Sequence, residues 1–174
     1  LRQSDAVFHH TVALPNLLKQ LHACVPLTQI EAVGVSCKPR PVEGSYMPCF
    51  LVGKAVAESI ALSRGIPLVE TTHQQGHVAA ALLACGNPDL FEKELLVFHI
   101  SGGTTELLLC RGYQILKKVG GTTDLYAGQA VDRIGVRLGF PFPAGSFLSE
   151  KAAECTATIK PKVSVKGTQC SLSG

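Results

Sequence analysis

The chain has 174 residues, and 46% of them are hydrophobic, which is enough to bury a core and excludes an intrinsically disordered protein. Its 16 basic and 13 acidic residues leave a formal charge of +3, so charge alone predicts no nucleic-acid partner. The uncharged runs are broken by glycine, proline, histidine or polar residues, and we therefore expect no role in a membrane.

Helices and strands alternate in the first half of the predicted structure. Leucines at helical spacing, among them Leu14 and Leu18, predict the first helix, and Gly65 is placed to end the second. The predicted elements are a helix over residues 12–23, a strand over 31–36, a proline-rich loop over 37–48, a helix over 50–64, a strand over 66–70 and a helix over 73–84. This order is typical of an α/β fold.

The second half of the predicted structure begins with three consecutive strands. A Gly-Gly pair and an Arg-Gly pair are placed to turn the chain between them, which indicates a meander. The predicted elements are strands over 94–101, 104–110 and 113–119, helices over 127–138 and 145–154, and an exposed strand over 158–166. A proline-rich loop over 140–144 separates the two helices.

The seven cysteines are dispersed along the chain and form no CxxC pair. This pattern is typical of reduced thiols, and it predicts a cytoplasmic protein without a disulfide or zinc framework. The chain starts at Leu1 and stops at Gly174, shortly after a predicted strand. We therefore expect a fragment of a larger domain, in which a site can be incomplete.

His73 and His77 lie four residues apart in a predicted helix. Residues with this spacing share one face of a helix, so the two imidazoles can hold one divalent ion with a third ligand from elsewhere. The alternative is that His73 caps the helix and His77 packs against the core, and the residues alone favour this alternative. Gln74 stands where a zincin peptidase needs a glutamate base, so metal-dependent proteolysis is disfavoured.

The apolar stretch that begins at Leu95 runs into the sequence SGGTT at residues 101–105. Gly-Gly between two strands is an ordinary two-residue turn, and spacing alone favours that interpretation. The hydroxyl residues on both sides of the glycines add donors to backbone amides that could hold phosphate oxygens. Hairpins of this kind occur in actin-like and sugar-kinase-like ATPases.

Two carboxylates lie in or just before the helix predicted over 127–138. Asp132 is by default a solvated surface residue, and its functional alternative is a hydrogen bond to a ribose. Asp124 is predicted to cap the helix.

Four motifs, in this order, resemble those of one family: the universal tRNA threonylcarbamoyladenosine transferases, or TsaD family, formerly called O-sialoglycoprotein endopeptidases. Residues 73–77 (HQQGH) are similar to the family's H-x-E-G-H metal motif, and 101–107 (SGGTTEL) to its S-G-G-H-T-Q-L phosphate hairpin. Residues 127–133 (AGQAVDR) resemble its A-G-E-A-F-D-K helix, and 142–145 (FPAG) the Y-P-G-G that follows. The resemblance covers nearly the whole chain, and four ordered motifs are more specific than one.

The resemblance implies an α/β fold of the actin-like ATPase type, shared by actin and sugar kinases. One lobe would extend over about residues 1–120 and the second would start over about 121–174, with both family termini missing. A divalent metal, expected to be iron with zinc as the alternative, would be bound by His73 and His77. The residues implied to contact ATP or threonylcarbamoyl-AMP are His99, Ile100, Ser101, Gly102, Gly103, Asp132 and Gly145. No catalytic residue is implied.

The resemblance also implies an acyltransferase. The family moves a threonylcarbamoyl group from its adenylate to the exocyclic amine of the adenosine beside the tRNA anticodon. Its partners are tRNA and proteins of the TsaB and TsaE type in the cytoplasm. One alternative is a carbamoyltransferase of hydrogenase maturation, which would normally also carry acylphosphatase-like and zinc-finger segments. The other is a non-catalytic paralogue that binds a partner protein through a helical face.

Several residues depart from the family pattern. Thr104 stands where the family has histidine, Glu106 where it has glutamine, and Gln75 and Gln129 where it has glutamate. The loop over 37–48 differs from the family's glycine-rich loop. These departures indicate a divergent branch or a paralogue. The family's opening phosphate strand and its later aspartate ligand lie outside the chain, so we expect this segment alone to lack part of the active site.

Overall fold

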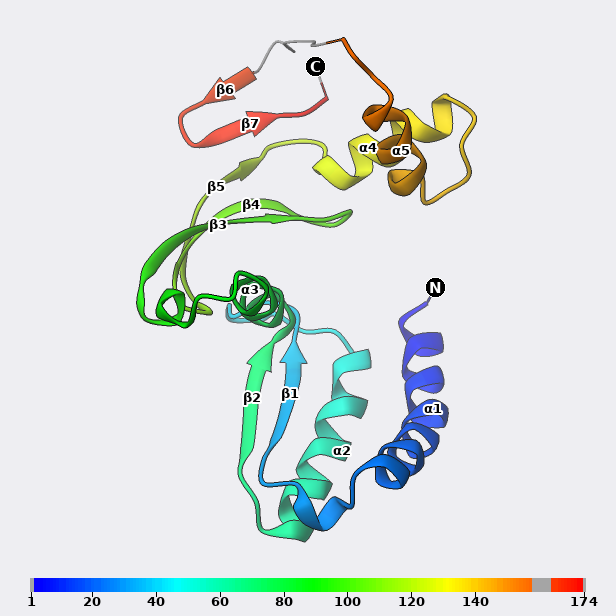
Figure 1. The fold of residues 1–174 in the computed structure, drawn as a ribbon, viewed down its shortest axis with the longest axis vertical. Coiled ribbons are helices and arrows are strands. Elements are labelled where there is room, and N and C mark those ends of the chain that lie inside the picture. The colour runs from blue at the N-terminus through cyan, green and yellow to red at the C-terminus, as the bar shows by residue number, and fades with distance from the viewer. Residues whose placement is uncertain (1, 158–163, 174) are drawn as a thin grey trace. The chain divides into compact units, whose positions relative to one another are not determined.

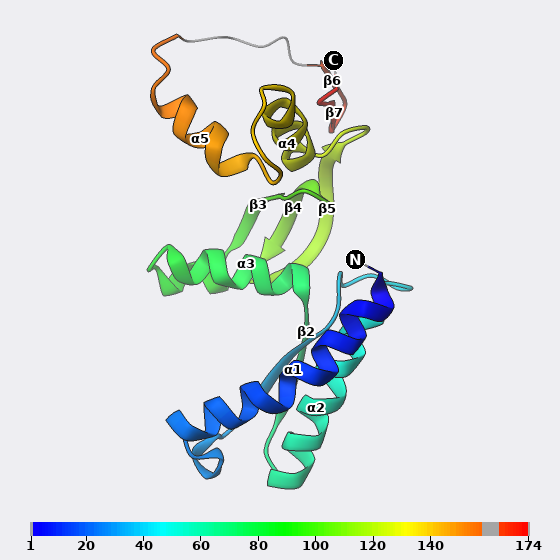
Figure 2. The same cartoon turned by 90° about the vertical axis from the view of Figure 1, so that its right-hand side faces the viewer.

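The structure, a computed structural model, describes residues 2–157 and 164–173 (Figures 1 and 2). The chain divides into two compact units, residues 1–87 and 88–174, and both contain helices and strands. The expected α/β class is therefore confirmed. The predicted division into lobes near residue 120 concerns the whole family fold and stays a prediction.

The first unit is built around two parallel strands. Its elements are α1 (Gln3–Cys24), the 3-10 helix η1 (Leu27–Gln29), β1 (Val33–Lys38), α2 (Cys49–Arg64), β2 (Leu68–Thr72) and α3 (His73–Ala84). Val33 of β1 lies opposite Leu68 of β2, and α2 makes the crossover that a parallel pair needs. In Figure 1, α2 lies along these strands and α1 lies along α2.

The start of α1 was predicted nine residues too late, because the helix begins at Gln3 and not near residue 12. The first three residues of α1, Gln3-Ser4-Asp5, are polar, so apolar periodicity could not place the start of the helix. The Asp5 carboxylate accepts a hydrogen bond from the Arg2 amide at 3.3 Å, which satisfies a free donor at the helix start. The helix then continues through Pro15.

The end of α2 was predicted correctly. Gly65 follows Arg64 with φ of +62°, in the left-handed region that glycine adopts without steric cost. The Ile66 amide donates to the Ala61 carbonyl at 3.1 Å, which closes the helix with the six-residue bond of a Schellman motif. The chain can therefore reverse directly into β2.

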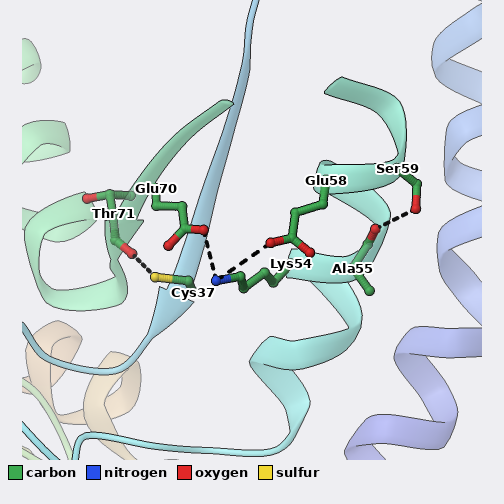
Figure 3. A network of polar contacts seen from close by, with 7 residues as sticks. All are labelled: Cys37, Lys54, Ala55, Glu58, Ser59, Glu70 and Thr71. Atoms are coloured by element: carbon green, nitrogen blue, oxygen red, sulfur yellow. Dashed lines mark hydrogen bonds and ion pairs between the residues drawn. The ribbon is translucent and has the colours of Figure 1, made fainter. Parts of the chain in front are cut away.

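Lys54 ties α2 to the end of β2 (Figure 3). Its ammonium lies 2.8 Å from a Glu70 carboxylate oxygen and 3.7 Å from Glu58. The hydrogen bond between Lys54 and Glu70 raises the pKa of Lys54 and lowers the pKa of Glu70. Beside this pair, the Cys37 thiol donates to the Thr71 carbonyl at 3.1 Å. These contacts hold the strand end from which α3 starts, although exposed ion pairs add little stability by themselves.

The second unit is a mixed sheet with two helices. Its elements are the 3-10 helix η2 (Pro88–Glu92), β3 (Glu94–Ile100), β4 (Thr105–Arg111), β5 (Gln114–Thr122), α4 (Ala127–Arg137), α5 (Gly145–Ala153), β6 (Ser164–Lys166) and β7 (Gln169–Ser171). The strand order is β3-β4-β5-β7-β6, in which β5 and β7 run parallel and the other pairs antiparallel. The predicted meander of three strands is confirmed.

The C-terminal strands agree only partly with the prediction. Residues 158–163 of the predicted tail strand lie outside the described residues, Ser164–Lys166 is a strand, and β7 was not predicted. Strand β7 is three residues long and carries no alternating pattern, so periodicity could not reveal it.

Side chains on one face of β4 form the core of the second unit. Leu108 and Cys110 are almost fully buried, at 2% and 0% exposure, and they alternate with more exposed residues as a strand with one buried face requires. Burial raises the pKa of the Cys110 thiol. All seven cysteines are free, as predicted. Among the described helices, none has both the length and the hydropathy needed to cross a bilayer.

Candidate functional site

The two histidines of α3 point at a common position. The Nε2 atoms of His73 and His77 lie 3.0 Å apart, and both side chains are exposed. The favoured alternative from sequence, a capping His73 and a core-packed His77, is therefore wrong. It failed because the cap is the preceding residue, Thr72, whose hydroxyl accepts from the Gln75 amide at 3.2 Å.

The first turn of α3 is held by polar contacts on both sides of His73. The Gln75 side chain accepts from the Thr72 hydroxyl at 2.9 Å and from the Thr72 amide at 3.2 Å, which completes a capping box. The buried Gln74 donates its amide to the Pro39 carbonyl at 3.0 Å. The loop over 37–48, which departs from the family pattern, thus supports this turn. Gln75 makes its cap without the charge of the family's glutamate.

An aromatic ring restricts His73 from the side of α2. The Phe50 and His73 rings meet edge to face, with centroids 6.1 Å apart and planes at 67°. The pKa of His73 is lowered, first because neighbouring atoms partly desolvate the ring and second because His77 lies close. A lowered pKa keeps this imidazole neutral near pH 7, which is the form that binds metals.

The geometry of the histidine pair fits a metal ion. Metal–nitrogen bonds to histidine are about 2.0–2.1 Å, so nitrogens 3.0 Å apart can share one ion. In the described part of the chain, no group of three histidine, cysteine, aspartate or glutamate side chains is arranged to hold a metal. The pair therefore supplies two ligands.

The link between β3 and β4 is more open than the two-residue turn that spacing favoured. The Ser101 amide donates to the Thr104 carbonyl at 2.8 Å, and the Gly103 amide to the Ser101 hydroxyl at 3.2 Å. Among the described residues, the Ser101 carbonyl accepts from the Gly128 amide at 3.2 Å and not from the Thr104 amide, which a closed two-residue turn would require. The start of α4 is therefore bonded to the Ser101 carbonyl in this open turn.

Helix α4 begins directly on this turn. The Ala127 amide donates to the Thr105 hydroxyl at 2.8 Å, so Thr105 supplies the cap that the N-cap residue Tyr126 does not. A Cβ atom at Gly128 would lie 2.6 Å from the Gly102 amide nitrogen and 2.7 Å from the Ser101 carbonyl carbon, so only glycine permits this approach. The positive end of the α4 dipole thus faces the Ser101–Gly103 turn, as in anion sites at helix starts.

Thr104, the residue before β4, and Glu106, on the buried face of β4, are both buried. Thr104 is 7% exposed, and its hydroxyl lies 3.0 Å from that of Ser101. The Glu106 carboxylate, with 7% of its side chain exposed, pairs with the Lys118 ammonium at 3.1 Å. The two departures from the family pattern are therefore accommodated inside the sheet.

A groove of about 830 Å³ runs along α4. It is lined by Gly102, Gln129, Asp132, Arg133, Val136, Arg137 and Phe142. Asp132 is half-buried, and its carboxylate accepts from the Ala144 amide at 2.8 Å, so it is not the solvated residue expected by default. Arg133 and Arg137 lie one helical turn apart and form no ion pair within the described residues.

The residues predicted for the second unit are only partly brought together. Gly102 and Asp132 line the groove, Ser101 and Gly103 belong to the turn at its end, and Gly145 starts α5 beside Ala144. His99 and Ile100 lie on the last residues of β3, and Ile100 is exposed.

The sequence prediction missed several residues of the groove: Gln129, Arg133, Val136, Arg137 and Phe142. Residues 129, 132, 133 and 136 fall at the helical spacing that defines one face of α4, so this spacing around Asp132 could have revealed most of them.

Comparisons with known proteins agree with the motifs. A sequence model of the family described as TsaD, tRNA N6-adenosine threonylcarbamoyltransferase, matches residues 4–174. A protein named tRNA N6-adenosine threonylcarbamoyltransferase from Carboxydothermus hydrogenoformans is 34% identical over 129 residues, which are 74% of this chain and 36% of that protein. Proteins with the same name occur in Syntrophus aciditrophicus, 34% identical over 84% of this chain and 41% of the relative, and in Methanopyrus kandleri, 30% identical over 98% and 48%.

The match to the family extends over almost the whole chain, whereas the chain spans less than half the length of these curated relatives. The matched residues include the histidine pair, the Ser101–Gly103 turn and α4, which the structure places at helix starts and on the groove. The chain belongs to the TsaD family of tRNA N6-adenosine threonylcarbamoyltransferases.

Proposed function

We propose that the full-length protein is a tRNA N6-adenosine threonylcarbamoyltransferase that uses threonylcarbamoyl-AMP as its donor. The adenosine beside the anticodon contributes its exocyclic nitrogen, which forms a bond to the carbamoyl carbon. The bond between that carbon and the phosphate oxygen breaks, AMP leaves, and the amine loses a proton. No protein nucleophile is needed for this acyl transfer.

The observation that carries this proposal is the start of α4 on the Ser101–Gly103 turn, at the end of a groove. The helix dipole and the Gly102 amide, which belongs to the turn residue that lines the groove, would hold the phosphate of AMP and stabilise it as a leaving group. Asp132, which lines the same groove, would bind the ribose, with Gly145 nearby. His99 and Ile100 would complete the approach to the turn from β3.

The histidine pair would hold the metal ion in this proposal. His73 and His77 offer two imidazole nitrogens, which suit iron, the expected ion, and also zinc. A bound divalent ion supplies Lewis acidity and a fixed point that orients the threonylcarbamoyl group. Phe50 and the Thr72 cap keep the His73 ring in place for this role.

The family membership extends this proposal to the whole fold and its partners. The chain would contribute one lobe of an actin-like ATPase fold, over about residues 1–120, and the beginning of the second, over about 121–174. The partners would be tRNA and proteins of the TsaB and TsaE type, and the compartment would be the cytoplasm. The free cysteines agree with a reducing compartment.

The proposed reaction is tested with the full-length protein, synthetic threonylcarbamoyl-AMP and an unmodified tRNA, with mass spectrometry of the digested nucleosides as the readout. We expect the modified adenosine to form once per tRNA. A tRNA with guanosine in place of that adenosine is the control and should remain unmodified. Carbamoylation of a cysteine-containing peptide without any change to the tRNA would support the hydrogenase-maturation alternative, and the absence of both would support a scaffold.

Phe142 is expected to stack on the base of the bound nucleotide. The groove runs from Gly102 to Arg137, and Phe142 is 75% exposed on its wall. Stacking on an aromatic ring contributes about 1–3 kcal/mol per base, so Phe142→Ala should weaken AMP binding about tenfold, measured by isothermal titration calorimetry. Phe8→Ala, which removes a similarly exposed ring from α1, is the control. Equal AMP affinity of the Phe142 variant and the wild type would contradict this placement.

A further inference from the structure

Asp124 gathers an unusual number of hydrogen bonds for an exposed carboxylate. It lies in the link between β5 and α4, and sequence analysis predicted that it caps α4, which is wrong because Tyr126 is the N-cap residue. Its oxygens instead accept from four donors: the amides of Leu125 (2.6 Å) and Leu172 (2.9 Å) and the hydroxyls of Ser171 and Ser173. The Thr122 hydroxyl lies 3.1 Å from one carboxylate oxygen and 2.9 Å from the Leu125 carbonyl, and its single proton can serve only one of the two.

Three of these four donors come from the end of β7 and the two residues after it. Ser171 is the last residue of β7, and Leu172 and Ser173 follow it. The backbone pairing between β5 and β7 covers two residue pairs, Gly121 with Gln169 and Thr122 with Cys170, and the amide of Thr123 in the link also donates to the Cys170 carbonyl at 2.9 Å. A carboxylate that binds all three residues therefore adds a substantial part of the connection between the β6–β7 hairpin and the β5–α4 link.

The surrounding donors favour the charged form of the Asp124 carboxyl group. The hydroxyls of Ser171 and Ser173, followed by the amides of Leu172 and Leu125, stabilise the carboxylate and hold the pKa of Asp124 far below its usual range. Because the pKa of Asp124 is lower in the folded state, its ionisation stabilises the fold at every pH above the pKa of an unfolded aspartate, near 3.9. This stabilisation declines as the pH falls below that pKa and is lost as the pH falls through the folded-state pKa. The carboxylate is therefore charged at neutral pH, the form that accepts these hydrogen bonds.

The segment that Asp124 holds leads directly into the start of α4. Helix α4 begins at Ala127, whose amide is capped by Thr105, and Gly128 contacts Ser101. Tyr126 provides no side-chain cap, so the position of this first turn depends on the Thr105 contact and on the link that precedes it. Asp124 fixes that link through Ser171 and Ser173.

We propose that Asp124 is a positioning residue, which ties the β5–α4 link to residues Ser171–Ser173 and thereby holds the first turn of α4 on the Ser101–Gly103 turn. Its part in nucleotide binding rests on the proposed function, because the Ser101–Gly103 turn and α4 form one end of the proposed AMP groove. Asp124 itself lines no part of that groove as far as the structure describes it.

The test compares Asp124→Ala and Asp124→Asn with the wild type in the full-length protein. Amide hydrogen exchange is followed in peptides that cover residues 101–105 and 127–130, and AMP binding is measured by calorimetry. We expect faster exchange in both peptides and about tenfold weaker AMP binding for alanine, because small displacements of positioning groups are costly. Asparagine keeps one acceptor oxygen and should have a smaller effect. Glu154→Ala, which removes an exposed, paired carboxylate that follows α5, is the matched control.

A second pair of variants tests the partner segment. Ser171→Ala and Ser173→Ala each remove one donor to the same carboxylate oxygen, and they should raise exchange at residues 127–130 as Asp124→Asn does. If Asp124→Ala does not fold, these two serine variants test the proposal in its place. Faster exchange confined to residues 164–173, with unchanged exchange at 101–105 and 127–130, would show that Asp124 only fastens the hairpin and would overturn the proposal. If the wild type binds no AMP, the proposed groove fails, and the exchange measurements still decide the role of Asp124.

Discussion

His77→Ala is expected to remove bound metal and to slow single-turnover threonylcarbamoyl transfer by about 100-fold or more. In the wild type, His77 Nε2 lies 3.0 Å from His73 Nε2, so the two nitrogens can bind one ion. The variant keeps only the His73 nitrogen. Because the described residues hold no group of three ligating side chains, nothing near the pair can replace the lost ligand within that part of the chain. Metal content by mass spectrometry and the transfer rate are measured on the same preparation.

The control for this variant is His9→Ala, which removes an exposed histidine from α1. Chelator treatment of the wild type should reproduce the loss of transfer, and restoring iron should reverse it. Unchanged metal content and an unchanged rate in His77→Ala would eliminate the metal site. Lost metal with an unchanged rate would leave the site structural and would remove the metal from the proposed reaction.

Gly128→Ala is expected to weaken AMP binding by about 100-fold while the protein stays folded. The added methyl group would lie 2.6 Å from the Gly102 amide nitrogen, and both contacting segments are backbone that cannot rotate away. The start of α4 would therefore move off the turn, and a misplacement of about 1 Å can cost about 100-fold in function. Alanine is a better helix former than glycine by about 1 kcal/mol, which opposes any loss of stability.

The matched control is Gly53→Ala in α2. This glycine is also helical, and a methyl carbon added to it would lie 4.0 Å from its nearest neighbour, Val35 Cγ2, which is ordinary van der Waals contact. AMP affinity is measured by calorimetry and folding by thermal denaturation for both variants. The same AMP affinity in Gly128→Ala and Gly53→Ala would contradict the assignment of the Ser101–Gly103 turn to phosphate binding.

Local signals in the sequence predicted much of the fold. The bounds of α3 were correct because Thr72 provides a cap and apolar residues with helical spacing follow it. The end of α2 was correct because Gly65 is a strong local stop. The pair of His73 and His77 could be predicted because residues four apart on a helix always share a face.

The features that the sequence did not reveal depend on contacts between distant segments. The cap of α4 comes from Thr105, which lies 22 residues earlier, and not from the neighbouring Asp124. The α4 groove needs Phe142 from a proline-rich loop whose path the helical pattern does not specify. In the open turn the Ser101 carbonyl accepts from Gly128, 27 residues later, whereas the sequence Gly-Gly by itself is equally suited to a closed turn.

The contacts of Asp124 can form only late in the synthesis of the protein. Ser171 and Ser173 follow Asp124 by 47 and 49 residues in the chain. A chain that emerges from the ribosome N-terminus first must therefore expose β3, β4, β5 and α4 before these donors are available. The β3–β4 hairpin can form early because its contacts are local, but the link before α4 acquires its full set of hydrogen bonds only when residue 173 has been made.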